Sequence, residues 1–140
     1  MKRKATARWT GDLKTGRGQV SAGSGAFSDL SYSFTTRFED APGTNPEELV
    51  AAAHAGCFSM ALSGQLGNAG LKPEQIETRA DLTMEKLEAG WTVTAIHLDV
   101  VVKVPGATAE QLQTCADNAK KGCPISRLLK TEITMTARLA

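Results

Sequence analysis

The feature that most constrains the fold is a stretch of small and apolar residues that begins with nearly every signal of a helix start. Asn45 can cap a helix, Pro46 suits its first position, and Glu47 and Glu48 lie where carboxylates favour the positive end of the helix dipole. Apolar residues then recur at helical spacing until residues 67–70 supply a stop. We predict one helix of about six turns, roughly 30 Å long. Its apolar stripe comprises Leu49, Val50, Ala53, Cys57, Met60 and Ala61.

This helix is too apolar for the surface of a small monomer. Alanine and glycine occupy several of its sides, which would let neighbouring elements approach closely. Its most apolar window, residues 49–62, is about 14 residues long, short of the roughly 20 residues that span a bilayer. We expect a central helix that a second copy of the chain helps to cover, which would make the protein a homodimer.

Alternating residues predict strands on both sides of the helix. The pattern is clear from Leu30 to Phe38, and glycine-rich breaks precede it, so the first 38 residues are predicted to be strands joined by turns. Arg37 would then lie opposite the apolar row of the last strand. Residues 76–87 and 91–104 are predicted to form a hairpin, with alternate residues from 94 to 104 on one face.

The C-terminal third adds two helices and a strand. Thr108 and Gln111 have the spacing of a capping box, which predicts a helix to residue 121. Cys123 and Pro124 restart a short helix over 125–129, and residues 132–139 alternate as a closing strand. This order of elements indicates a single α+β domain over residues 1–140.

Composition excludes several classes of function. The chain of 140 residues has 16 Lys and Arg against 15 Asp and Glu, so it carries no electrostatic footprint for nucleic acid or an anionic membrane. The basic residues 1–4 are not followed by the apolar segment of a signal peptide. Three cysteines without CxxC spacing favour a reducing compartment over a disulfide scaffold. We therefore expect a cytoplasmic protein.

The surroundings of the three cysteines predict different behaviour. Cys123 lies beside a predicted helix start, where unpaired N–H groups favour a thiolate, although a small capping residue that simply fits explains the position equally well. Cys57 lies in mid-helix among apolar neighbours, as packed thiols do, and would need an outside cation such as Arg37 for activation. Cys115, on the presumed inner face of the 109–121 helix, is predicted to be structural.

Histidine raises the alternative of a metal site. His54 precedes Cys57 by one turn, so the two could share a metal ion with Cys123 as a third ligand. Zinc ligands usually occur as clustered pairs, however, and a lone histidine on a helix of small residues is more often a hydrogen-bonded core residue. His97, within a predicted strand, is a weaker candidate.

Several motifs together resemble the osmotically inducible protein C (OsmC) family. Their order and spacing, the chain length and the alternation of sheet and helix match this family over essentially the whole chain. The helix start at 45–48 and the stretch at 54–57 resemble this branch more than the organic hydroperoxide resistance (Ohr) branch. The motifs are Thr36-Arg37-Phe38, Gly43-Thr44-Asn45-Pro46-Glu47-Glu48-Leu49, residues 52–62, and Gly122-Cys123-Pro124-Ile125-Ser126.

The resemblance implies a thiol-dependent peroxidase that reduces organic hydroperoxides, and hydrogen peroxide less well. It also implies antiparallel sheets around long central helices in an intertwined homodimer. Cys57 would be the peroxidatic thiol, Cys123 the resolving thiol and Arg37 the group that activates Cys57, with Glu47 orienting Arg37 through an ion pair. No metal or flavin is required. The reductant would be a small dithiol such as dihydrolipoamide, free or protein-bound, or a thioredoxin-like donor.

Helix geometry adds a hypothesis about the dimer. Glu47 and Cys57 are ten positions apart, which is about 15 Å on one straight helix and too far for one compact site. Either a long Arg37 bridges much of this gap or Glu47 serves the partner chain, and we hypothesise that Arg37 and Glu47 reach Cys57 across the dimer interface. Two other functions stay open, namely a non-enzymatic dimer that encloses a small apolar molecule, and a metal-dependent hydrolase that uses His54, Cys57 and Cys123.

Overall fold

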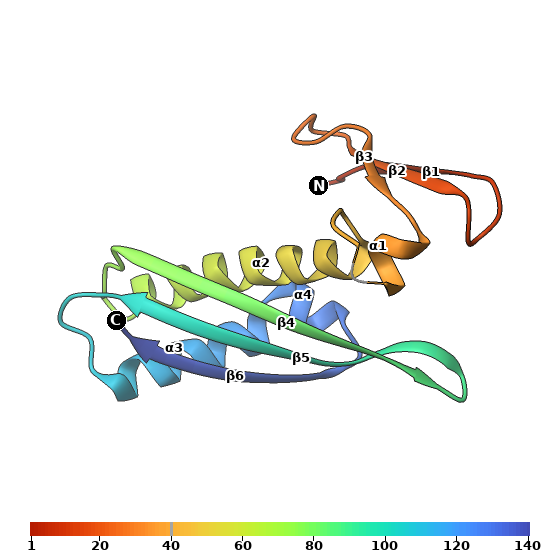
Figure 1. Ribbon diagram of the computed structural model, residues 1–140. Coiled ribbons are helices and arrows are strands. Elements are labelled where there is room, and N and C mark those ends of the chain that lie inside the picture. The colour runs from red at the N-terminus through yellow and green to blue at the C-terminus, as the bar shows by residue number, and fades with distance from the viewer. Residues whose placement is uncertain (40) are drawn as a thin grey trace. The chain divides into compact units, whose positions relative to one another are not determined.

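The computed structural model describes residues 1–39 and 41–140, which form two compact units, Met1–Leu49 and Val50–Ala140. The first unit holds three strands, a short helix and the start of the long helix α2 (Pro46–Asn68), as Figure 1 shows. The second unit holds the rest of α2, three strands and two further helices. This mixture of helix and sheet confirms the predicted α+β class, whereas the single domain stays a prediction.

The strands of the first unit form an antiparallel sheet. β1 (Ala5–Thr10), β2 (Arg17–Ala22) and β3 (Leu30–Tyr32) pair in the order β1-β2-β3. Gly18 on the central strand lies in register with both Trp9 and Tyr32. A Cβ atom at Gly18 would overlap the ring of Tyr32, so a residue without a side chain lets that ring cross the strand.

The predicted strand over residues 30–38 is wrong beyond Tyr32, because residues Phe34–Phe38 form helix α1. The Ser33 side chain accepts a hydrogen bond from the Thr36 N–H at 3.3 Å, and the Thr36 hydroxyl accepts one from the Ser33 N–H at 2.9 Å. This reciprocal cap satisfies backbone donors at the helix start, which an alternating strand would not do. Arg37 therefore lies on a helix and not on the polar face of a strand.

Helix α2 begins as predicted, since the Asn45 side-chain oxygen accepts the N–H of Glu48 at 2.8 Å. Its buried side differs from the predicted stripe, because the helix is apolar all round and periodicity could not select one face. Met60 on the predicted stripe is 80% exposed in the single chain. The residues that are buried recur every four positions and are His54, Phe58, Leu62 and Leu66.

Helix α2 is also long and apolar enough to cross a membrane, judged by length and composition only. Core helices of soluble proteins pass the same test, so this finding is a weak indication of a membrane segment. Phe58, Leu62 and Leu66 belong to the protein core, which favours the interpretation as a core helix.

The sheet of the second unit combines both strand directions. β4 (Gln75–Leu87) and β5 (Gly90–Lys103) form the predicted antiparallel hairpin, but β6 (Glu132–Leu139) runs parallel to β5. The expectation of antiparallel sheets is therefore wrong for this one pair. The cause is the crossover through α3 (Ala109–Gly122) and α4 (Pro124–Leu128), which returns the chain to the start of β5 before β6 begins.

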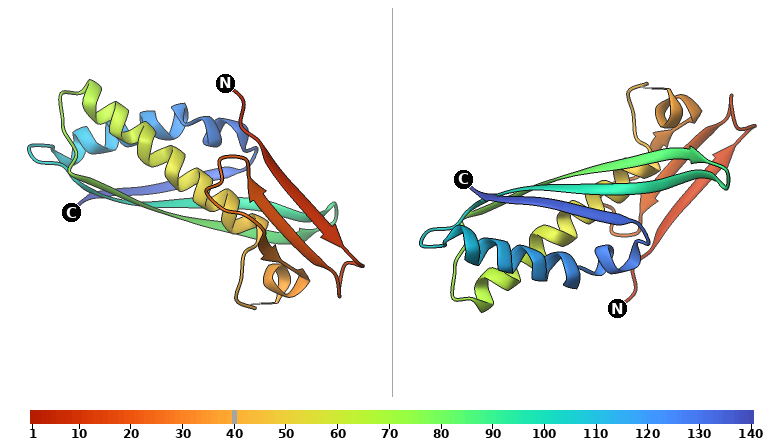
Figure 2. Two further views of the ribbon diagram at one scale, coloured as in Figure 1. Left: turned by 90° about the horizontal axis from the view of Figure 1, so that it is seen from above. Right: turned by 90° about the horizontal axis from the view of Figure 1, so that it is seen from below.

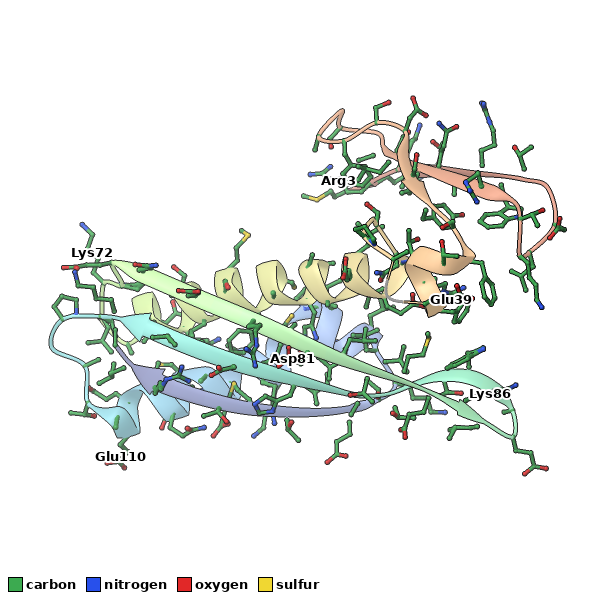
Figure 3. The ribbon with its side chains drawn as sticks, in the orientation of Figure 1. Arg3, Glu39, Lys72, Asp81, Lys86 and Glu110 are labelled. Carbon is green, nitrogen blue, oxygen red and sulfur yellow. The ribbon has the colours of Figure 1, made fainter. Side chains whose placement is uncertain are left out.

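The core of the second unit lies between this sheet and the helices α2 and α3, which cover the same face (Figure 2). Alternate residues of β5 face the helices, as predicted, while charged side chains such as Lys72, Lys86 and Glu110 point outward in Figure 3. The predicted capping box of α3 is present, because Thr108 and Gln111 bond each other at 3.1 and 3.0 Å. The fully buried residues of β5 are Ile96, Leu98, Val100 and Val102.

Candidate active site

Two of the three cysteines meet inside the second unit. Cys57 lies midway along α2, and Cys123 lies between α3 and α4, 66 positions later in the chain. Their sulfur atoms are 3.0 Å apart, and both residues are free thiols. Cys123 is fully buried, whereas Cys57 is partly exposed. The structure thus brings together the residues predicted to be the peroxidatic and resolving thiols.

The local sequence explains why helix α3 ends just before Cys123. The Cys123 N–H still bonds the Ala119 carbonyl of α3 at 2.8 Å, but its own ψ angle of 122° is extended, which ends that helix. Pro124 then occupies the first turn of α4, where its missing N–H costs nothing. Cys123 is therefore the residue that precedes α4, as predicted from the sequence.

The two thiols differ in acidity. Burial raises the pKa of the Cys57 thiol, and the hydrogen bond and charge of Cys123 raise it further against an opposing bond from the Ile125 N–H. The pKa of Cys123 is lowered, although burial alone would raise it. The thiolate of Cys123 is stabilised most by Cys57, and then by Ser126 and by the Ile125 N–H. Cys123 is therefore the more acidic thiol of the pair.

Ser126 and His54 complete the surroundings of Cys123. His54 is fully buried, and its Nε2 lies 2.8 Å from the Ser126 hydroxyl. Burial lowers the pKa of His54, so the ring is neutral near neutral pH. Ser126 is not among the site residues predicted from the sequence. The signal that could have identified it is its place three residues after Cys123, in the first turn of the short helix.

Arg37 and Glu47 form a two-point ion pair within the first unit. The Arg37 Nε donates to the two carboxylate oxygens of Glu47 at 3.0 and 3.1 Å, and Nη2 donates to one of them at 2.7 Å. Arg37 is 37% exposed and Glu47 16% exposed at the side chain. Because Glu47 occupies one edge of the guanidinium, the Nη1 edge is directed away from the bridge and could face an anion. The predicted ion pair is present.

The guanidinium of Arg37 also borders an apolar hollow of about 260 Å³ in the first unit. The guanidinium carbon lies 5.0 Å from the centre of the Phe38 ring. The centre of this ring is 4.9 Å from the centre of the Phe34 ring. Such a lining suits an apolar group next to a positive charge. The hollow is lined by Trp9, Leu13, Tyr32, Phe34, Arg37 and Phe38, among others.

The remaining candidates have structural surroundings. Cys115 is buried on α3, where its sulfur donates to the Gln65 carbonyl at 3.7 Å, in agreement with its predicted structural role. His97 bonds the Thr134 hydroxyl at 2.7 Å across two strands. Within residues 1–39 and 41–140, no three His, Cys, Asp or Glu side chains are grouped as metal ligands, so His54, Cys57 and Cys123 do not form the metal site considered above.

The sequence matches the family model described as "OsmC-like protein" over residues 38–138. The chain belongs to this family. Peroxiredoxin OsmC of Escherichia coli (strain K12) is 50% identical to it over 137 residues, which are 98% of this chain and 96% of that protein. An organic hydroperoxide resistance protein of Xanthomonas axonopodis pv. citri is 32% identical over 99 residues, or 70% of this chain and 68% of the relative. The predicted family resemblance is confirmed.

Solved OsmC and Ohr structures share the fold. The crystal structure of the organic hydroperoxide resistance protein OhrB of Bacillus subtilis superposes with a TM-score of 0.71 at 24% identity, covering 100% of this chain and 98% of that one. An OsmC-like protein of unknown function from Vibrio cholerae gives a TM-score of 0.79 at 17% identity, covering 99% of both chains. At these identities the comparison establishes the fold alone.

Proposed function

We propose that this protein is a thiol-dependent peroxidase that reduces organic hydroperoxides, and hydrogen peroxide less well. The observation that carries the proposal is the contact between two free thiols, Cys57 and Cys123, at 3.0 Å. The names of two relatives, peroxiredoxin and organic hydroperoxide resistance protein, support the same chemistry. The apolar hollow beside Arg37 suits the organic part of such a substrate better than hydrogen peroxide.

The reaction has two thiol steps. The Cys57 thiolate attacks the outer oxygen of the hydroperoxide, the O–O bond breaks, and the alkoxide leaves and takes up a proton to become an alcohol. Cys57 is thereby oxidised to a sulfenic acid. The Cys123 thiolate then attacks the Cys57 sulfur, a disulfide forms, and hydroxide leaves as water after protonation. A dithiol donates two electrons to restore both thiols.

The first step needs a positive charge beside Cys57, and Arg37 can provide it. Since burial raises the pKa of Cys57, the attacking thiolate needs a cation, and a guanidinium also stabilises the alkoxide that leaves. Glu47 fixes the orientation of Arg37 through the two-point ion pair. The four proposed site residues are therefore Cys57, Cys123, Arg37 and Glu47. This mechanism uses no metal or prosthetic group.

The proposal includes a homodimer in which Arg37 and Glu47 of one copy serve Cys57 of the other. Support comes from α2, where the apolar side chain of Met60 is 80% exposed in the single chain. We further propose a cytoplasmic location, which would keep the thiols reduced between turnovers. The reductant would be a small dithiol such as dihydrolipoamide, or a thioredoxin-like donor.

Turnover of cumene hydroperoxide with dihydrolipoamide tests the proposal. We expect activity in the wild type, none with Cys57→Ser, and a single turnover at most with Cys123→Ser. Cys115→Ser is the matched control, because Cys115 is also buried but bonds a backbone carbonyl. Hydroperoxide loss no faster than with a free thiol would favour the second candidate, a non-enzymatic dimer that binds a small apolar molecule in the hollow beside Arg37.

A further inference from the structure

A buried histidine hydrogen-bonds a serine in the short helix that Cys123 precedes. His54 Nε2 lies 2.8 Å from the Ser126 hydroxyl. Ser126 lies three residues after Cys123, in the first turn of α4, and its hydroxyl and backbone N–H act to lower the pKa of Cys123. The Cys123 sulfur is in turn 3.0 Å from the sulfur of Cys57. Ser126 therefore lies between His54 and the cysteine pair inside the second unit.

The proton position on His54 decides what Ser126 can do for Cys123. A serine hydroxyl has one proton to donate and can accept through its oxygen. If Ser126 donates to His54 Nε2, it has no proton left for the sulfur. If the His54 Nε2–H donates to Ser126, the hydroxyl proton is available to Cys123, where it forms a charge-assisted bond with the thiolate.

Burial favours the second arrangement. His54 is 0% exposed, and its Nδ1 has no hydrogen-bond partner among the residues that the structure describes. A proton on Nδ1 would be a buried donor without an acceptor, and it would also forfeit the bond from Ser126 to the thiolate. A charged ring would carry that same unpaired proton, which agrees with the lowered pKa of His54. The Cys57 thiol is the titratable group that contacts Cys123 from α2.

We infer that His54 is a positioning residue for the resolving thiol, which as the Nε2–H tautomer holds the Ser126 hydroxyl in place to donate to the Cys123 sulfur. The arrangement would serve Cys123 twice, when it attacks the sulfenic acid of Cys57 and when it leaves as a thiolate during reduction of the disulfide. The inference rests on the proposed function for these two steps. The inferred hydrogen bonds themselves can be tested without a hydroperoxide.

The first test measures Cys123 alone. In a Cys57→Ser, Cys115→Ala background, Cys123 is the one remaining cysteine, so ultraviolet absorbance of the thiolate against pH reports its ionisation. At a fixed pH below the midpoint, Ser126→Ala should lower the thiolate population about tenfold, which is what one hydrogen bond to a charged group supplies. His54→Leu should lower it at least about twofold, because a polarised and oriented donor is lost. His54→Gln should restore it, since its amide offers an N–H near the former Nε2.

A double variant shows whether His54 acts on Cys123 through Ser126 or independently of it. His54→Leu combined with Ser126→Ala should lower the thiolate population no more than Ser126→Ala does alone, because both act through one bond. An unchanged Cys123 titration in His54→Leu, or additive effects in the double variant, would overturn the inference. If His54→Leu does not fold, nitrogen NMR of His54 in the wild type decides the matter, with a proton on Nε2 supporting the inference and one on Nδ1 overturning it.

A kinetic readout separates this inference from the proposed function. With Cys57 intact, His54→Leu should slow disulfide formation more than it slows hydroperoxide loss, so that dimedone traps more Cys57 sulfenic acid than in the wild type. Equal slowing of both steps would contradict a role at Cys123. Failure of the wild type to consume the hydroperoxide would refute the peroxidase and leave the thiolate and NMR tests of His54 standing.

Discussion

Replacing Glu47 with glutamine should lower the rate of hydroperoxide reduction strongly and the free energy of unfolding only slightly. The change keeps the shape of the side chain but removes the charge that receives Nε and Nη2 of Arg37 at 3.0 and 2.7 Å. Arg37 is 37% exposed, and an ion pair this open to solvent contributes at most about 1 kcal/mol to the free energy of unfolding. Activity should suffer more, because in the proposed site an arginine that Glu47 no longer holds must give up about 2 kcal/mol of rotamer freedom to meet the Cys57 sulfur.

A penalty of about 2 kcal/mol in the transition state corresponds to a roughly 30-fold lower rate of hydroperoxide loss. Stopped-flow kinetics with cumene hydroperoxide measures the rate, and urea unfolding measures the stability. Glu48→Gln is the matched control, since it removes the same charge from the same helix turn at an exposed position. Equal rates in Glu47→Gln and Glu48→Gln would refute the role assigned to the ion pair.

Leu62→Ala should destabilise the protein by about 2–5 kcal/mol in urea unfolding, because Leu62 is 0% exposed in the core; a loss below that range would show that the core collapses around the gap. Met60→Asp should shift the protein toward monomers in sedimentation, and an unchanged dimer would show that the exposed side of α2 is not the interface. Because the pKa of His54 is lowered in the folded state, the unfolded chain binds more protons below about pH 6.5, so stability should fall as the pH drops through that value. His54→Gln should flatten this decline in urea midpoints measured across pH, and a decline equal to that of the wild type would place its cause elsewhere.

Local signals predicted most elements of the fold. Caps fixed the start of α2 at Asn45 and of α3 at Thr108, because such bonds depend on residues only three positions apart. The strand prediction was wrong over residues 34–38, where the sequence alternates but also has a local cap. The hydrogen bonds between Ser33 and Thr36 favour a helix there and outweigh the alternating pattern. The direction of β6 was missed because strand pairing depends on the crossover and not on the residues of the strand.

The candidate site could be predicted only in part. The residue pattern favoured Cys123 over Cys57 as the more acidic thiol, in agreement with the pKa directions, but the choice of Cys57 as its partner came from the family resemblance. The bond from His54 to Ser126 joins residues 72 positions apart, and no local signal reports such a contact. The buried side of α2 was equally hidden, because a helix with apolar residues on every side has no periodic preference.

Peptide mass mapping after a single turnover tests the central claim most directly. The reduced protein is treated with one equivalent of cumene hydroperoxide, the remaining thiols are blocked, and the peptides are identified. The account predicts a disulfide between Cys57 and Cys123, formed in proportion to the hydroperoxide consumed, with Cys115 still reduced. Consumption of the hydroperoxide with both Cys57 and Cys123 left as free thiols would contradict it.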